Sequence, residues 1–287
     1  METPIPFDTA VELLLYLFIT LAMLCIGMSA TLSDMLSMLH DRSKTTRTIV
    51  ANIVIPPAVA FALIALIPMD DAAATVLLLL AFAPGGINAV QFSTKSPGQL
   101  AAAGELLFLL SAISLVTAPL AAGWLLPEDA RVRIPVDHLV FRVVVLVVAP
   151  LILGMVLRAA APGIAEKIFK PAMLISTLAF IASVLLSLSM RQDALTELGA
   201  GTAIAMLAFI LILMGVGWAL GGPTADHRQV LAVTTNLRNV GLVYVLVDEC
   251  CGEPLLSTSV LAFMALMVPV NLVFTVTIAV MRKRRTA

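Results

Sequence analysis

Apolar runs separated by short polar stretches fill almost the whole chain. Because ~20 apolar residues cross the hydrocarbon core of a bilayer as a helix, this pattern predicts an all-α polytopic membrane protein. We predict nine transmembrane helices, over residues 11–31, 47–67, 72–95, 98–122, 138–158, 170–190, 198–221, 226–248 and 255–281. Composition agrees: 61% of the 287 residues are apolar and 12% are charged, and the mean hydropathy is +1.07, beyond the range of soluble domains.

Two of these apolar segments carry helix-breaking sequences near their midpoints. The third span contains PGGIN at 84–88, and the eighth contains TTNLRNVG at 234–241. Irregular backbone at membrane depth is tolerated only where protein buries it or where it lines a wet cavity. Paired breaks in corresponding spans are typical of the substrate site of a secondary transporter.

The longest polar interval, residues 123–137, divides the chain into two repeats. With the span at 138–158 set aside, the four remaining spans of each half correspond, and the two broken spans match each other. One helix separates the blocks, so the repeats are expected to be inverted. The predicted units are an outer tail 1–10, a first repeat of four helices 11–122, an outer loop 123–137, a second repeat of five helices 138–281, and a basic inner tail 282–287.

The distribution of Lys and Arg predicts the orientation. With the N-terminus outside and the C-terminus inside, the outer loops hold only three basic residues, Arg131, Arg133 and Arg191, and most of the acids. This asymmetry follows the positive-inside rule for a multi-pass protein of the cell (cytoplasmic) membrane. The net charge of −1 gives no reason to expect a nucleic-acid partner.

Two charged residues fall inside predicted spans. Arg238 lies in the second break, and Glu105 lies about two turns into the fourth span. Intramembrane charges normally face a cavity or a partner, and a guanidinium can bind a carboxylate or phosphate through its fork. Two interpretations stay open: Arg238 and Glu105 form a buried structural pair, or at least one of them handles substrate or protons.

Further polar residues near the breaks complete the candidate site. The substrate-binding candidates are Asn88, Gln91, Thr234, Thr235, Arg238, Asn239 and Asn271. The coupling or cation-site candidates are Glu105, Asn52, Ser111 and Thr234. Cys25 lies in a span and Cys250 and Cys251 in an outer loop, and no His or Cys spacing suits a metal, so we expect neither a metal site nor a cofactor other than a coupling Na⁺ or H⁺.

Several sequences resemble the bile acid:sodium symporter family, within the bile/arsenite/riboflavin transporter superfamily. They are APGG at 83–86, the helix ending TAP at 117–119, and NVGL at 239–242, with weaker likenesses at CIGMS (25–29) and NIVIPP (52–57). The resemblance implies a core domain with two crossed broken helices and a separate panel formed by the spans at 11–31, 138–158 and 170–190. It also implies alternating-access transport of organic anions, usually driven by sodium.

The chain departs from the family pattern at the sodium site. Thr234 stands where the family has a Glu of the second broken helix, and Arg238 stands where it has a Gln. A fixed positive charge there opposes Na⁺ binding by electrostatic repulsion. The leading hypothesis is therefore a divergent transporter with altered or absent sodium coupling, and the alternative is a conventional sodium-coupled organic anion or bile acid symporter.

Other classes fit less well. The spans contain no His-Glu-x-x-His motif, no Asp pair and no Ser with a membrane His, so an intramembrane enzyme is not expected. The five Lys residues all fall in loops or the tail, which argues against a retinal protein. The expected partners are a small organic anion and the lipid bilayer, while the substrate, the direction of transport and the oligomeric state are not determined by the sequence.

Overall fold

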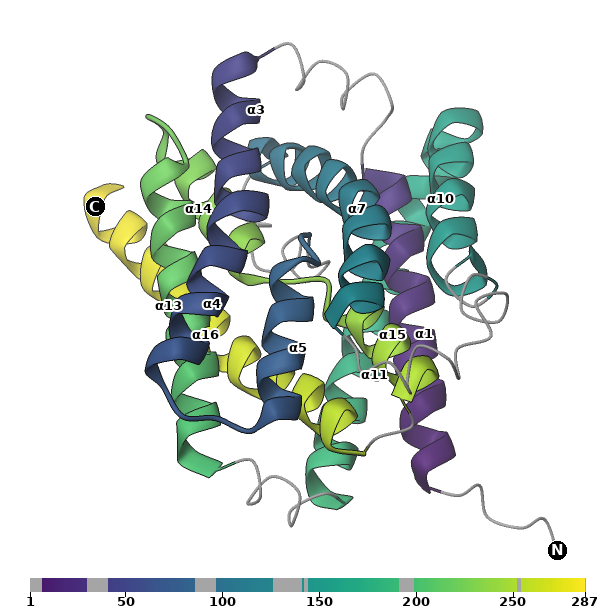
Figure 1. Ribbon diagram of the computed structural model, residues 1–287. Helices are drawn as coiled ribbons and strands as arrows, with labels where there is room; N and C mark the ends of the chain where they lie inside the picture. The colour runs from purple at the N-terminus through teal and green to yellow at the C-terminus, as the bar shows by residue number, and fades with distance from the viewer. Residues whose placement is uncertain are drawn as a thin grey trace, which may run out of the picture.

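The computed structural model describes residues 7–29, 41–85, 97–125, 141, 144–190, 199–251 and 254–286. Within these ranges all regular secondary structure is helical. The helices pack around a centre in which two short helices end, as Figure 1 shows for α5 and α14. The predicted all-α fold class is confirmed.

The first part of the chain contributes helices of very different lengths. They are α1 (Phe7–Ser29), a continuous rod of α3 (Arg42–Ile49), η1 (Val50–Val54) and α4 (Ile55–Leu66), then α5 (Asp71–Ala81) and α7 (Pro97–Leu125). Asp70 begins α5, because its carboxylate accepts hydrogen bonds from the backbone N–H groups of Ala72 (2.9 Å) and Ala73 (3.4 Å). With 11 residues, α5 is too short to cross a bilayer.

The described residues in the second part of the chain form seven helical segments. They are η2 (Val144–Val148), α10 (Ala149–Ala160), α11 (Pro162–Met190), α13 (Gly199–Leu220), α14 (Ala225–Asn236), α15 (Val240–Cys251) and α16 (Pro254–Thr286). Cys250 and Cys251 lie in the last turn of α15, so their assignment to a loop was wrong. The helix continues past the apolar stretch because its final residues include no Gly or Pro that would end it.

Five described helical stretches are long and apolar enough to cross a membrane. They are Thr9–Ser29, Arg42–Leu66, Gly199–Leu220, Ala225–Val247 and Leu255–Met281. Shorter apolar helices cover Asp71–Ala81, Leu109–Leu125 and Val144–Ala160. A multi-pass membrane protein follows, whereas the count of nine spans and the inverted repeats stay predictions.

The helices pack in two groups. In one, α1 packs mainly against α10 and α11; in the other, α13 packs mainly against α14 and also touches α4 and α16. The α1–α10 contact depends on Gly27 and Gly154, because a Cβ on either would collide with a backbone carbonyl of the other helix. Small residues at such crossings allow the close backbone approach by which membrane helices associate.

The segment that contains the second break is more deeply buried than the other helices. Large apolar side chains such as Leu178 on α11 and Val273 on α16 are exposed, as expected of a surface that faces lipid. By contrast, every residue in the most apolar window of Ala225–Val247 is buried. The irregular backbone between α14 and α15 is therefore enclosed by protein, which is the condition for irregular backbone at membrane depth.

Candidate functional site

The second break is present where the sequence predicted it. α14 ends at Asn236, residues 237–239 are not helical, and α15 begins at Val240. The side-chain Oδ1 of Asn239 accepts a hydrogen bond from the backbone N–H of Leu242 at 3.2 Å. Asn239 thereby satisfies one of the amides that a new helix leaves open, as an N-cap residue does.

The first break starts at the end of α5. Helix α5 stops at Ala81, and the chain passes through Ala83 and Pro84 to Gly85, whose φ is +87°. A Cβ at Gly85 would lie 2.8 Å from the Cβ of Leu110 and 2.9 Å from the backbone nitrogen of Ser111, so only glycine fits this turn against α7. The rest of the predicted break, which includes Asn88, lies outside the described residues. Gln91, which follows the break, lies outside them too.

The two breaks touch each other. The backbone N–H of Asn239 donates to the carbonyl oxygen of Ala83 at 2.8 Å. Because α5 and α14 approach from opposite ends of the molecule and both stop near its centre, their C-terminal ends meet at this contact (Figure 1). We call this meeting point of the two breaks the crossing; that the two segments form a pair of crossed broken helices, as the resemblance implies, stays a prediction.

Arg238 fills the crossing with its guanidinium. The side chain is completely buried. Its Nε donates to the Leu80 carbonyl at 2.8 Å, its Nη2 to the carbonyls of Ala81 at 2.7 Å and Asn52 at 3.1 Å, and its Nη1 to the Thr235 carbonyl at 3.3 Å. Four of the five N–H groups of the guanidinium are used, and all four bond to backbone oxygens.

These carbonyls lack their usual helical donors, and among the described residues only that of Leu80 has another backbone donor, the N–H of Ala83 at 3.1 Å. The N–H groups that would bond the Asn52 carbonyl, four or five residues later, belong to Pro56 and Pro57, which have none. Leu80 has Pro84 four residues on. Arg238 therefore supplies donors that the prolines withhold.

The other two carbonyls lie at helix ends. Ala81 is the last residue of α5, so its oxygen has no donor within the helix. Thr235 lies in the last turn of α14, and the amide four residues later, that of Asn239, bonds to Ala83 instead. Both helix C-termini carry partial negative charge, which favours a cation between them.

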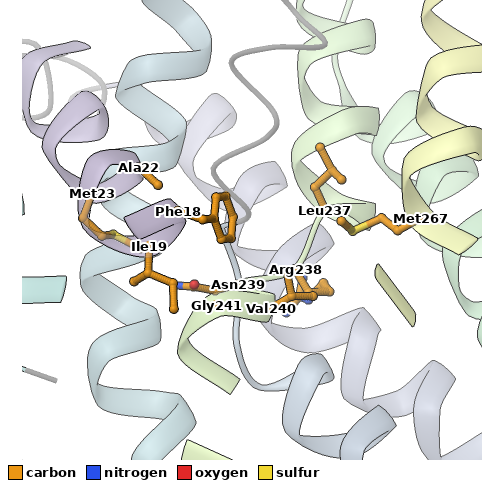
Figure 2. Close-up of a pocket in the computed structure, with 10 residues that line it drawn as sticks. All are labelled: Phe18, Ile19, Ala22, Met23, Leu237, Arg238, Asn239, Val240, Gly241 and Met267. Carbon is orange, nitrogen blue, oxygen red and sulfur yellow. The ribbon is translucent and has the colours of Figure 1, made fainter. Parts of the chain in front are cut away.

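A small cavity separates the second break from α1. It has a volume of about 10 Å³, and it is lined by residues 237–241 and Met267 on one side and by Phe18, Ile19, Ala22 and Met23 of α1 on the other (Figure 2). A Cβ on Gly241 would lie 2.8 Å from the Cγ1 of Ile19. Helix α1 is therefore closely packed on the N-terminal end of α15, and the space between them is about that of one water molecule.

The remaining candidate residues differ in how their polar atoms are bonded. Thr234 Oγ1 donates back to the Val230 carbonyl at 2.9 Å. Asn271 and Asn236 exchange side-chain hydrogen bonds, with Asn271 Nδ2 to Asn236 Oδ1 at 2.6 Å and Asn236 Nδ2 to Asn271 Oδ1 at 3.1 Å. This pair ties the end of α14 to the middle of α16, a link that the sequence did not predict.

Three buried oxygen atoms near the breaks have no hydrogen-bond partner among the described residues: Asn52 Oδ1, Ser111 Oγ and Thr235 Oγ1. Two of them belong to residues predicted as cation-site candidates, and the third to a predicted substrate-binding residue. The side chain of Glu105 lies outside the described part of α7, so its pairing with Arg238 stays a prediction.

Sequence reasoning missed the backbone oxygens, because any residue can supply one. A signal was nevertheless present. A proline removes the donor of the carbonyl four residues earlier, so Pro56 and Pro84 mark the carbonyls of Asn52 and Leu80 as acceptors that need another partner.

Comparison with protein families decides the class. A model described as Sodium Bile acid symporter family matches residues 16–198, more than half of the chain. The chain belongs to this family. Family members are transporters, so the chain is a transporter-type multi-pass membrane protein.

The family match includes the first break, whereas the second break lies beyond its last residue. The likeness of NVGL at 239–242 to the family therefore depends on the motif and on the contact between the breaks. No curated protein matches the chain.

Proposed function

We propose that the chain is a secondary transporter of small or amphipathic organic anions in which Arg238 takes the place of a coupling sodium ion. The supporting observation is the buried guanidinium, which donates to four backbone carbonyls where two half-helices end. Unwound backbone carbonyls and half-helix C-termini are the groups that coordinate Na⁺ in transporters with broken helices. With these oxygens already bonded to a fixed charge, transport has no need of sodium at this position.

The proposed substrate site lies where the second break faces α1. A half-helix N-terminus, such as that of α15 at Val240, favours an anion through its open amides and positive dipole end. Helices α1, α10 and α11 form the proposed panel, and the other helices form the core. Movement of the panel relative to the core would enlarge the small cavity between α1 and the break and expose it to each side in turn.

Arg238 contributes mainly its charge in this proposal. A bidentate contact with a substrate anion would require the guanidinium to release at least one of the carbonyls that it bonds, and the buried oxygen would lose that donor. Among the other candidates, Thr235 has the hydroxyl best suited to a substrate, because that buried group has no partner in the part of the chain that the structure describes. The proposed roles of Asn88, Gln91, Thr234, Asn239 and Asn271 in substrate binding rest on their sequence positions.

The first experiment is a thermal-shift screen of carboxylates, sulfonates and keto acids on the purified protein, followed by uptake of the best ligand into proteoliposomes. Uptake is measured with and without a Na⁺ gradient, at equal membrane potential and pH. We expect equal initial rates. An absolute requirement for sodium would refute the proposal.

Proton coupling through Glu105 is part of the same proposal and is tested separately. A pH gradient should then drive accumulation, and Glu105→Gln should abolish that response while leaving exchange of substrate across the membrane intact. If a pH gradient has no effect on the unmodified protein, the carrier is facilitative.

A sodium symporter is the competing function, and one observation favours it. The unpartnered oxygens of Asn52, Ser111 and Thr235 are buried polar groups of the kind that bind a hard cation. A ligand that binds only the folded state raises its stability, so Na⁺ should then raise the unfolding temperature in detergent more than K⁺ or choline does. Equal effects of the three cations would exclude this alternative.

The proposed topology has nine spans in two inverted repeats, with the N-terminus outside and the C-terminus inside the cell membrane. It is supported by the distribution of Lys and Arg and by the shared end of the molecule at which α1 stops and α3 starts (Figure 1). Fusion of a fluorescent protein and of alkaline phosphatase to the C-terminus tests the orientation. High phosphatase activity and no fluorescence would contradict it.

A further inference from the structure

A second cavity lies between helices α3, α7, α13 and α14, away from the crossing. Its volume is about 430 Å³, and its walls are the start of α3, Leu106 of α7 and the turn between α13 and α14. A cavity of this size holds a ligand of many atoms, whereas the space at the break holds about one water molecule. Helix α3 begins at the upper end of the molecule in Figure 1, the end predicted to face inward.

The cavity is lined by an excess of cationic groups. The cations are Lys44 and Arg47 of α3, the acid in the lining is Asp41, and His227 of α14 lines the cavity as well. The Asp41 carboxylate caps α3, accepting a hydrogen bond from the backbone N–H of Lys44 at 3.0 Å. Within the described ranges the exposed Arg47 side chain makes no hydrogen bond or ion pair, so its fork is available to a ligand.

The α13–α14 turn is shaped to let these cations converge. Gly222 has φ +84°, and a Cβ there would lie 3.0 Å from Nη1 of Arg47, so glycine makes room for the guanidinium. The Nε of Arg228 donates to the Gly222 carbonyl at 2.7 Å and holds the turn. Thr224 then starts α14 by accepting a hydrogen bond from the His227 N–H at 3.3 Å, which directs the positive end of the helix dipole to this region.

Apolar side chains line the inner part of the same cavity. Leu106, Leu220 and Leu231 face it from three different helices. A site with cations at its mouth and hydrocarbon deeper inside fits an amphiphile that has an anionic head. Another cavity of about 400 Å³, between α1 and α11, differs because Glu166 bonds Arg158 at 3.3 Å and offsets its charge.

We propose that the cavity between α3, α7 and the α13–α14 turn is a second anion site, which binds the phosphate group of an amphiphile or a phosphate ester. The guanidinium fork of Arg47 and the ammonium of Lys44 suit a phosphate, which accepts several charge-assisted hydrogen bonds. Either a membrane phospholipid headgroup or a soluble phosphate compound presents this group. The site is separate from the crossing, so its occupancy does not depend on the proposed transport function.

The test measures binding to the full chain in a neutral detergent. The probes are short-chain phosphatidylglycerol, glycerol 3-phosphate and inorganic phosphate, with short-chain phosphatidylcholine as the zwitterionic comparison. The variant Lys44→Gln/Arg47→Gln should weaken binding of the phosphate-bearing probe about tenfold or more. The matched control, Arg42→Gln/Lys170→Gln, removes the same charge from α3 and from the other cavity and should bind as the unmodified protein does.

The pattern of probes identifies the source of the phosphate. If phosphatidylglycerol binds and the two soluble phosphates do not, the natural ligand is a lipid headgroup. If inorganic phosphate binds as tightly as phosphatidylglycerol, the natural ligand is a soluble phosphate compound. Arg47→Lys, which keeps the charge but not the fork, should retain part of the affinity. Equal losses in the two double variants, or equal binding of phosphatidylcholine by the unmodified protein, would overturn the proposal.

Discussion

Two close helix contacts in this molecule are built on opposite principles. Where α1 crosses α10, both helices are continuous, and Gly27 and Gly154 allow the backbones to meet without a polar side chain. Where α5 and α14 meet, both helices have ended, and open carbonyls converge on Arg238. A contact between intact helices needs only space, whereas a contact between helix ends inside a membrane protein needs a positive charge.

The largest expected effect comes from removing that charge. Arg238→Met keeps most of the side-chain volume but leaves the carbonyls of Asn52, Ala81 and Thr235 without donors, and that of Leu80 with only the Ala83 N–H. Each buried acceptor left without a donor costs about 1–3 kcal/mol, so we expect the unfolding midpoint in detergent to fall by about 10 °C. A fall of only 1–2 °C would show that the crossing does not need the charge.

Soluble guanidinium sharpens this prediction, because it restores the missing donors without the side chain. Arg238→Ala leaves a space lined by the four carbonyls, and low millimolar guanidinium should raise its midpoint, while urea at equal concentration should not. The unmodified protein is the control and should show no rise. Absence of rescue, together with normal folding of the variant, would contradict a site that selects a cation.

The glycine contact should respond to added volume. Gly27→Ala or Gly154→Ala forces the Cβ into a backbone carbonyl, which cannot move aside as a flexible side chain can. Overpacking of this kind costs about 1–3 kcal/mol. Gly215→Ala is the matched control, since no atom lies within 4 Å of its added Cβ, and it should stabilise α13 by up to about 1 kcal/mol. Thermal unfolding of the three variants distinguishes these outcomes.

The smallest effect comes from giving one carbonyl its own donor. In Pro56→Ala, the new N–H can bond the Asn52 carbonyl within the helix, so that carbonyl depends less on Arg238. A double-mutant cycle with Arg238→Met should then give a coupling energy of about 1 kcal/mol. Pro150→Ala on α10, which has no link to Arg238, should show additive effects in the same cycle.

The sequence was informative about the elements and less so about their contacts. The apolar runs predicted the helices, and the break at 234–241 was found between α14 and α15. The Asn236–Asn271 pair was not predicted, because an Asn in a membrane helix has many acceptors within reach and the choice depends on packing. Asn271 was instead assigned to substrate binding, and that assignment stays a prediction.

By itself, the sequence determined that this is a helical membrane protein, that one apolar segment breaks in its middle, and that an arginine lies in that break. These features are local, since hydropathy, proline and glycine act on their own stretch of chain. Only the tertiary structure decided what the arginine binds. Asn52 is 186 residues from Arg238 along the chain, and Leu80 is 158 residues away, so no local rule brings their carbonyls to the guanidinium. Packing of the helices does so, because open carbonyls and a buried charge in a bilayer must satisfy each other.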